Sequence, residues 1–113
     1  MLCIKDKENL IQILKHCKRI EDKTNGIDME FFQNLDLREI VCFNILLIGE
    51  LAGCLSSDNS NEYNSISLKR IKEMSDVIEH KYEMVDKEVL FNTAKDNIPE
   101  IKNYCKSILE NEK

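Results

Sequence analysis

Apolar residues recur at helical spacing through long stretches of this chain that contain almost no helix breakers. The 113 residues include only three glycines and one proline. That is too few for the many tight turns that a sheet-rich fold requires. The sequence therefore predicts a small number of long helices.

The first helix is predicted over residues 4–23, with Asn25-Gly26 as its stop signal. Asp28 is expected to cap a short turn of helix that holds Phe31 and Phe32. A second long helix is expected from Asp36, which we interpret as its N-cap. This segment is apolar nearly all round, as in a helix buried on several sides.

A polar loop is predicted over residues 56–65, and a third helix from about Ser67. Asp86 is expected to cap a further helix, whose Val89, Leu90 and Ala94 would face inward. Pro99 then either starts a new helix or kinks the old one. These elements predict an all-α fold, an antiparallel up-and-down bundle of four to five helices in a single domain, residues 1–113. Broad apolar faces on the second and last helices leave room for a homodimer.

Composition excludes several classes of protein. The net charge of −5 lacks the global basic footprint of a dedicated nucleic-acid binder, so any contact with nucleic acid has to be local or shared with a partner. The longest apolar run, IVCFNILLIGELAGCL, is interrupted by Asn44 and Glu50 and is too short to cross a membrane. The N-terminus lacks a hydrophobic stretch of signal-peptide length, so we expect a cytoplasmic protein.

The five cysteines form no C-x-x-C pair, and no Cys/His cluster has metal-ligand spacing. We expect reduced, mostly buried thiols, with no metal and no cofactor. Asn44 and Glu50, inside the most apolar helix, are expected to be structural polar groups that hydrogen-bond across the bundle or a subunit interface. Gly49 beside them would allow a neighbouring helix to approach closely.

The stretch MSDVIEHKYEMVD, residues 74–86, gathers the candidate chemistry. Asp76 precedes His80 by four residues, so both lie on one helix face and can pair. A histidine of this kind is a common general acid or base, although a surface ion pair is the commoner meaning of the spacing. Tyr82 follows, and either packs under the next helix or exposes its hydroxyl. The other histidine, His16, is expected to face solvent.

Lysines and an arginine upstream of His80 form a small basic cluster, namely Lys69, Arg70 and Lys72. Arg70 and Lys72 are possible phosphate contacts, and a solvated face is the alternative interpretation.

Three segments together resemble the HepT-like family, also called DUF86, of the HEPN superfamily. They are NILLIGELAGCLS, MSDVIEHKYEMVD and LFNTAKDNIPEIK, and they stand in the family's order and spacing. The resemblance implies a dimeric helical bundle in which Arg-x4-His motifs of two subunits line a cleft that cuts RNA without metal. It also implies a toxin encoded beside a minimal nucleotidyltransferase antitoxin, which silences the toxin by adding AMP to a tyrosine.

By this resemblance, His80 corresponds to the catalytic histidine, Asp76 to the polar residue after the arginine, and Tyr82 to the AMP acceptor. The position of the family's arginine is occupied by Ser75, which cannot supply a fixed positive charge to phosphate. Loss of such a group commonly costs about 10²–10³ in rate. Further departures from the family pattern stand at Phe43, Leu51, Ser67-Leu68, Glu73 and Phe91.

Three functions follow as hypotheses. The first is an endoribonuclease toxin with a degenerate motif that weakens its activity. The second is a catalytically inactive helical dimer that binds a nucleotidyltransferase partner, nucleotide or RNA without cleavage. The third is a structural bundle in which the pairing of Asp76 with His80 is incidental.

Overall fold

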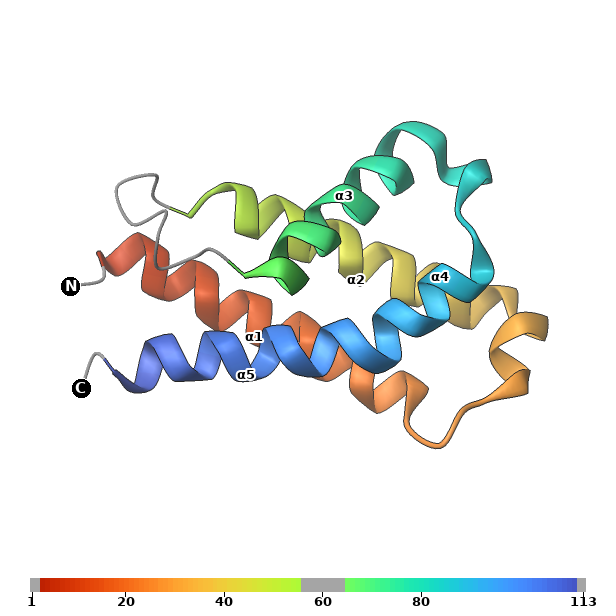
Figure 1. The fold of residues 1–113 in the computed structure, drawn as a ribbon, viewed down its shortest axis with the longest axis horizontal. Coiled ribbons are helices and arrows are strands. Elements are labelled where there is room, and N and C mark those ends of the chain that lie inside the picture. The colour runs from red at the N-terminus through yellow and green to blue at the C-terminus, as the bar shows by residue number, and fades with distance from the viewer. Residues whose placement is uncertain (1–2, 56–64, 112–113) are drawn as a thin grey trace.

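A computed structural model describes residues 3–55 and 65–111. In chain order its elements are α1 (Ile4–Thr24), η1 (Met29–Gln33), α2 (Leu35–Gly53), α3 (Ile66–Lys81), η3 (Tyr82–Met84), α4 (Lys87–Asn92), η4 (Thr93–Asn97) and α5 (Ile98–Glu110) (Figure 1). The segments η1 and η3 are 3₁₀ turns, and η4 is a π-helix. Every regular element of the described residues is thus helical, which confirms the all-α prediction.

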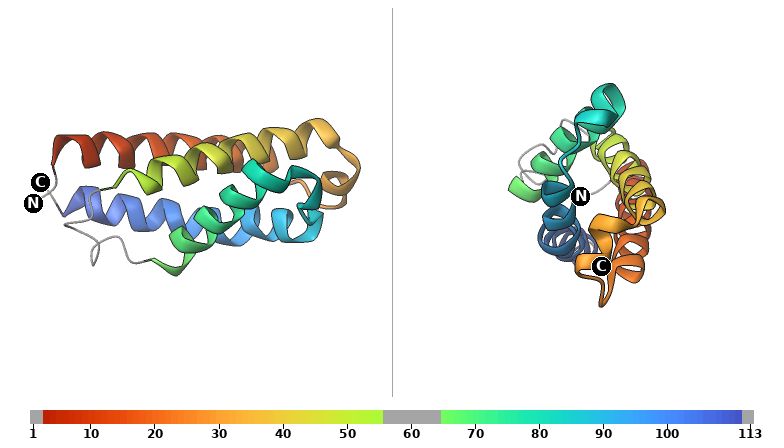
Figure 2. Two further views of the ribbon diagram at one scale, coloured as in Figure 1. Left: turned by 90° about the horizontal axis from the view of Figure 1, so that it is seen from above. Right: turned by 90° about the vertical axis from the view of Figure 1, so that its right-hand side faces the viewer.

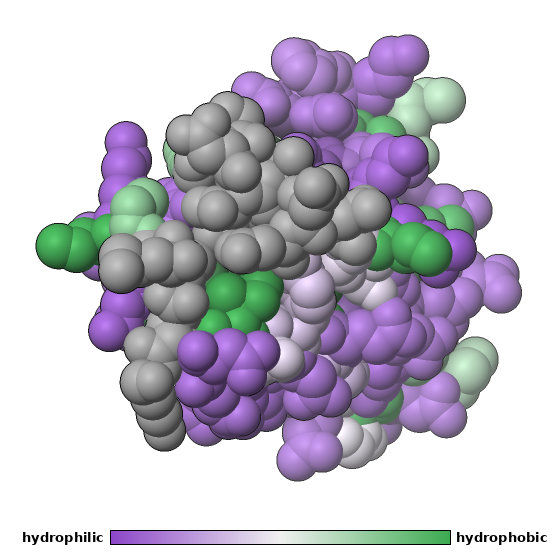
Figure 3. Space-filling model, turned by 60° about the vertical axis from the view of Figure 1, so that its left-hand side comes forward, coloured by the Kyte–Doolittle hydropathy of each residue, from purple (hydrophilic) through white to green (hydrophobic). Residues whose placement is uncertain are grey.

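The long helices alternate in direction, so the bundle is up-and-down and antiparallel (Figures 1 and 2). Helix α2 packs against α1 on one side and α3 on the other, while α5 lies along α1. The start of α1 and the end of α5 lie at the same end of the bundle (Figure 2). The described residues that are visible from that end are mostly hydrophilic, with some apolar side chains among them (Figure 3). No described helix combines the length and apolarity that a membrane crossing needs.

Local signals set the helix boundaries, with two corrections to the predicted caps. Helix α1 ends as expected, and Gly26 has a positive φ of 74°, which glycine adopts without strain. Asn34, not Asp36, caps α2, because its side chain accepts a hydrogen bond from the Leu37 N–H at 3.0 Å. Asp36 lies in the first turn, where its negative charge interacts favourably with the positive end of the helix dipole.

Asp28 precedes η1 but makes no side-chain cap; its own N–H instead donates to the Glu30 carboxylate at 2.9 Å. The cap predicted at Asp86 is confirmed, since its carboxylate accepts from the N–H groups of Glu88 and Val89. Helix α3 begins one residue before the predicted Ser67, with Ser65 as its cap. The predicted loop over residues 56–65 lies, except for Ser65, outside the described residues.

Helices α4 and α5 run into one another through the π-helix η4 (Figure 1). Pro99 lies in the first turn of α5, directly after this widened segment. Proline has no N–H to donate to the preceding turn, and a π segment is one way for a helix to accommodate an altered hydrogen-bond ladder. Pro99 thus lies at the start of a new α-helix, one of the two predicted alternatives, and the helical path reaches it from α4 through η4.

The core runs the length of the bundle. Its fully buried apolar side chains come from every long helix and include Leu10, Ile13, Ile20, Val41, Ile45, Ile48, Ile71, Leu90, Ile98 and Ile101. Leu90 and Ala94 face inward as predicted, whereas Val89 does not, because half of its surface is exposed. The five cysteines are all free; Cys17, Cys42 and Cys105 are buried, and Cys3 and Cys54 are exposed.

Candidate functional site

His80 lies in the last turn of α3, with 70% of its side chain exposed. The Glu79 carboxylate lies 3.9 Å from Nε2 of its ring. Asp76 is exposed one turn earlier on the same helix. Its predicted pairing with His80 is not among the ion pairs of the described residues. The exposed contact between His80 and Glu79, at 3.9 Å, contributes little to stability. It therefore leaves the ring of His80 open to a ligand or partner.

Ser75 lies in the contact between α3 and α2, and only 4% of its surface is exposed. Its hydroxyl donates to the Leu46 carbonyl at 3.3 Å. A Cβ added at Gly49 would lie 2.3 Å from the Ser75 Cβ, so the two helices meet at these residues. This confirms that Gly49 allows a neighbouring helix to approach closely.

Ser75 and His80 therefore do not converge within one chain. Five residues of α-helix turn the side-chain direction by about 140°. Ser75 accordingly faces α2, while His80 faces solvent.

The basic residues upstream are also distant from His80. Along the helix axis, Arg70 is about 15 Å and Lys72 about 12 Å from His80, at 1.5 Å per residue. Arg70 instead lines a groove of about 460 Å³ between α3 and the α4–η4 segment, together with Glu73 and Val77. Within one subunit, these side chains and His80 do not form a single phosphate site.

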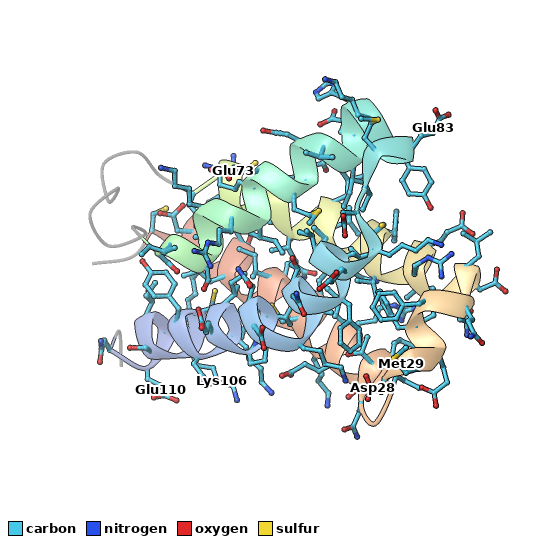
Figure 4. All side chains as sticks on the ribbon, turned by 45° about the vertical axis from the view of Figure 1, so that its right-hand side comes forward. Asp28, Met29, Glu73, Glu83, Lys106 and Glu110 are labelled. Atoms are coloured by element: carbon cyan, nitrogen blue, oxygen red, sulfur yellow. The ribbon has the colours of Figure 1, made fainter. Side chains whose placement is uncertain are left out.

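Tyr82 is 45% exposed and begins η3, the corner of the bundle marked by Glu83 in Figure 4. Desolvation raises the pKa of its phenol, and the nearby Cys42 and Glu39 add to this effect, while Arg38 opposes it. Its hydroxyl therefore stays protonated at neutral pH. The charges that act on it all belong to the first half of α2.

The two polar residues of the apolar helix have different surroundings. Asn44 is 1% exposed, and its side chain donates to the Ile40 carbonyl at 2.8 Å. Glu50, predicted to be a structural polar group in the core, is exposed. It lies two turns after Phe43, on the face of α2 turned away from α1 and α3, which accounts for the correction.

His16 was expected to face solvent but is half-buried. Its Nδ1 lies 2.9 Å from the Asn44 Oδ1, across the contact between α1 and α2. Both residues line a depression of about 650 Å³. No local pattern predicts this bond, because its partners are 28 residues apart and meet only when the helices pack.

The described residues contain no group of three or more histidine, cysteine, aspartate and glutamate side chains placed to hold a metal ion. The candidate functional groups of the described chain are those of the His80–Tyr82 corner and of the depression at His16.

The family model and the relatives that match this chain are all described as ribonucleases or putative ribonucleases. A family model described as Ribonuclease HepT-like matches residues 13–108. "Putative RNase TTE0752" of Caldanaerobacter subterraneus is 28% identical over 105 residues, which cover 92% of this chain and 94% of that protein. "Putative RNase MJ0125" of Methanocaldococcus jannaschii is 31% identical over 105 residues, covering 92% and 90%.

A third relative, "Gamma-glutamylcyclotransferase and putative RNase MJ0434" of Methanocaldococcus jannaschii, is 31% identical over 102 residues. The match covers 89% of this chain but only 46% of that longer protein. No solved structure matches the chain significantly.

Proposed function

The chain belongs to the HepT-like ribonuclease family, and from that membership we propose that it is a metal-independent endoribonuclease, the toxin of a toxin–antitoxin pair. The observation that carries the proposal is the exposed imidazole of His80 at the end of α3. In such a reaction the ribose 2′-hydroxyl attacks the adjacent phosphorus, and a histidine moves a proton to or from the reacting oxygens. His80 is the proposed proton-transfer residue.

Stabilisation of the phosphate charge is the weak part of this proposed site. We propose that Ser75 occupies the position of the motif arginine, and its hydroxyl is directed at the Leu46 carbonyl. A buried serine in this position offers no positive charge to phosphate. Cleavage is therefore expected to be slow, with Arg70 or Lys72 of a second subunit as the available cations and Asp76 as a neighbouring polar group.

The burial of Ser75 also supports a second candidate, a binding protein that does not cut. A serine that joins two helices serves packing, and the proposed motif then keeps its histidine without its phosphate contact. Such a protein would bind RNA, nucleotide or a nucleotidyltransferase partner through the same corner.

We further propose a single-domain homodimer that is silenced by a minimal nucleotidyltransferase. Large apolar side chains on α2, α3 and η3 give a dimer apolar surface to bury, among them Leu35, Val77 and Met84. Helix α5 offers less, since none of the large apolar side chains that are strongly exposed in the described residues lies on it. Tyr82 is 45% exposed, which supports its hydroxyl as the AMP acceptor. The free cysteines favour the cytoplasm.

The deciding experiment is cleavage of a mixed RNA pool by purified protein in the presence of a chelator. Wild type, His80→Ala and Ser75→Arg are compared. If the protein is a nuclease, wild type cleaves the RNA and His80→Ala does not. If only Ser75→Arg cleaves, the site is complete except for one positive charge. The natural protein then acts by binding and not by cleavage.

The same assay tests the partner. Co-expression with a nucleotidyltransferase encoded beside the chain should abolish cleavage and add one adenylyl group. Tyr82→Phe should stay unmodified, and modification of that variant would contradict the assignment of Tyr82.

A further inference from the structure

The depression between α1 and α2 holds the second histidine of the chain in a defined state. His16 is half-buried there, and the Asn44 that bonds its ring is 1% exposed. Asn44 donates its amide N–H to the Ile40 carbonyl, which fixes the orientation of the amide and leaves Oδ1 toward His16. A buried amide set in this way can only accept from the ring.

The tautomer of His16 follows from that bond. Since Asn44 Oδ1 accepts, Nδ1 of His16 carries the proton, and in the neutral ring the lone pair lies on Nε2. The opposite edge of the imidazole is thus a hydrogen-bond acceptor for whatever occupies the depression. A solvated surface histidine would exchange freely between tautomers, and this one is held in one.

Charges of opposite sign line the two sides of the depression. Arg19 of α1 lies on one side, and Lys15 and Lys23 continue its line along the exposed face of the helix, about 6 Å apart per step. Acidic residues on this part of α1 already have cationic partners, Lys102 for Glu21 at 2.9 Å and Lys18 for Asp22 at 3.9 Å. Lys15, Arg19 and Lys23 take part in none of the ion pairs within the described part of the chain, so this row of cations can meet an extended polyanion.

The α2 side carries carboxylates and an aromatic ring. Asp36 and Glu39 line it, and Phe43 lies beside them with 59% of its surface exposed. Carboxylates in nucleic-acid interfaces accept from exocyclic amino groups of bases, and exposed aromatic rings stack on bases. The depression thus has a side for phosphates and a side for bases.

From this arrangement we propose that the depression binds a nucleotide of single-stranded RNA. The phosphate contacts Arg19, the ribose 2′-hydroxyl donates to Nε2 of His16, and the base stacks on Phe43. A contact with the 2′-hydroxyl distinguishes RNA from DNA. The inference rests on the proposed role in RNA metabolism and names a contact for the substrate outside the His80 corner.

The test measures binding without cleavage. A short labelled single-stranded RNA and the DNA of the same sequence are titrated by fluorescence anisotropy, with all variants made in the His80→Ala chain. Phe43→Ala should weaken RNA binding about tenfold. Arg19→Ala should reduce the slope of log affinity against log salt by roughly 0.7, the value for one phosphate contact. Lys5→Ala removes one positive charge from the far end of α1 and should bind like its parent.

His16→Ala should reduce the preference for RNA over DNA, with His16→Gln as a second variant in case the alanine disturbs the fold. If Phe43→Ala and Arg19→Ala both bind RNA as tightly as the His80→Ala parent, the inference is wrong. The depression would then be a site for a protein partner. An equal loss in Lys5→Ala overturns it as well, since binding would then be unspecific. A parent that binds RNA while wild type fails to cleave contradicts only the nuclease.

Discussion

Two positions five residues apart on α3 have opposite surroundings. Ser75 is pressed against Gly49 of α2, with its hydroxyl on a backbone carbonyl. His80 extends into solvent beside a single exposed carboxylate. Both belong to the same short segment of sequence, yet Ser75 is packed against α2 while the side chain of His80 is 70% exposed. Substitution of Ser75 therefore changes a packed contact between helices as well as the proposed site, whereas substitution of His80 changes an exposed group.

The contact at Gly49 should give the largest effect. Gly49→Ala places a methyl group 2.3 Å from the Ser75 Cβ, so α2 and α3 have to separate. We expect a loss of about 3 kcal/mol in the free energy of unfolding, the upper part of the usual range for overpacking. Urea denaturation measures it.

The matched control is Gly53→Ala on the same helix, because nothing lies within 4 Å of its added Cβ. Alanine has the better helix propensity, so this variant should gain up to about 1 kcal/mol. Equal stabilities for the two variants would show that α2 and α3 are not in close contact.

Alkaline pH should have the second largest effect on stability, through a thiol in the first half of α2. Burial raises the pKa of the Cys42 thiol from 9.0 to about 11. The folded pKa exceeds the unfolded one, so the unfolded chain loses its proton first and stability falls as pH rises from 9 to 11. Two pKa units correspond to about 3 kcal/mol at the upper end. Urea midpoints across this range measure the loss.

Burial raises the pKa of Cys105 as well, to about 12, and that of Cys17 further. Cys42→Ala should therefore reduce the alkaline slope by up to one proton without abolishing it. An unchanged slope would mean that the Cys42 thiol ionises equally easily in the folded protein.

His80→Ala should give the smallest effect on stability, within about 0.5 kcal/mol, as is usual for exposed positions without special contacts. Thermal unfolding by circular dichroism measures it, beside the cleavage assay. A change above 1 kcal/mol would place His80 in a structural contact and remove the contrast with Ser75.

Much of the architecture could be predicted from periodicity and local signals. Helix α1, the cap at Asp86 and the stop at Gly26 depend on residues close in sequence, and each agrees with the structure. Errors arose where two local candidates compete, as at Asn34 and Asp36, or where apolar character was equated with burial, as at Val89.

The candidate site could be predicted less completely. The segment with His80 and Tyr82 is visible as a motif, and its role stays a prediction. Glu50 stood within an apolar run and was expected inside, but a helix that packs on two sides still has an outer face. The sequence does not show which face that is.

The sequence by itself determined the helices, their order and the family, because spacing, capping and breaker residues act within a few positions. Only the tertiary structure decided which residues meet across those helices. It placed Ser75 against Gly49 and set the ring of His16 on Asn44, 28 residues away. The physical reason is that the rotation and approach of packed helices depend on side-chain fit along both partners at once, and no local pattern contains that information.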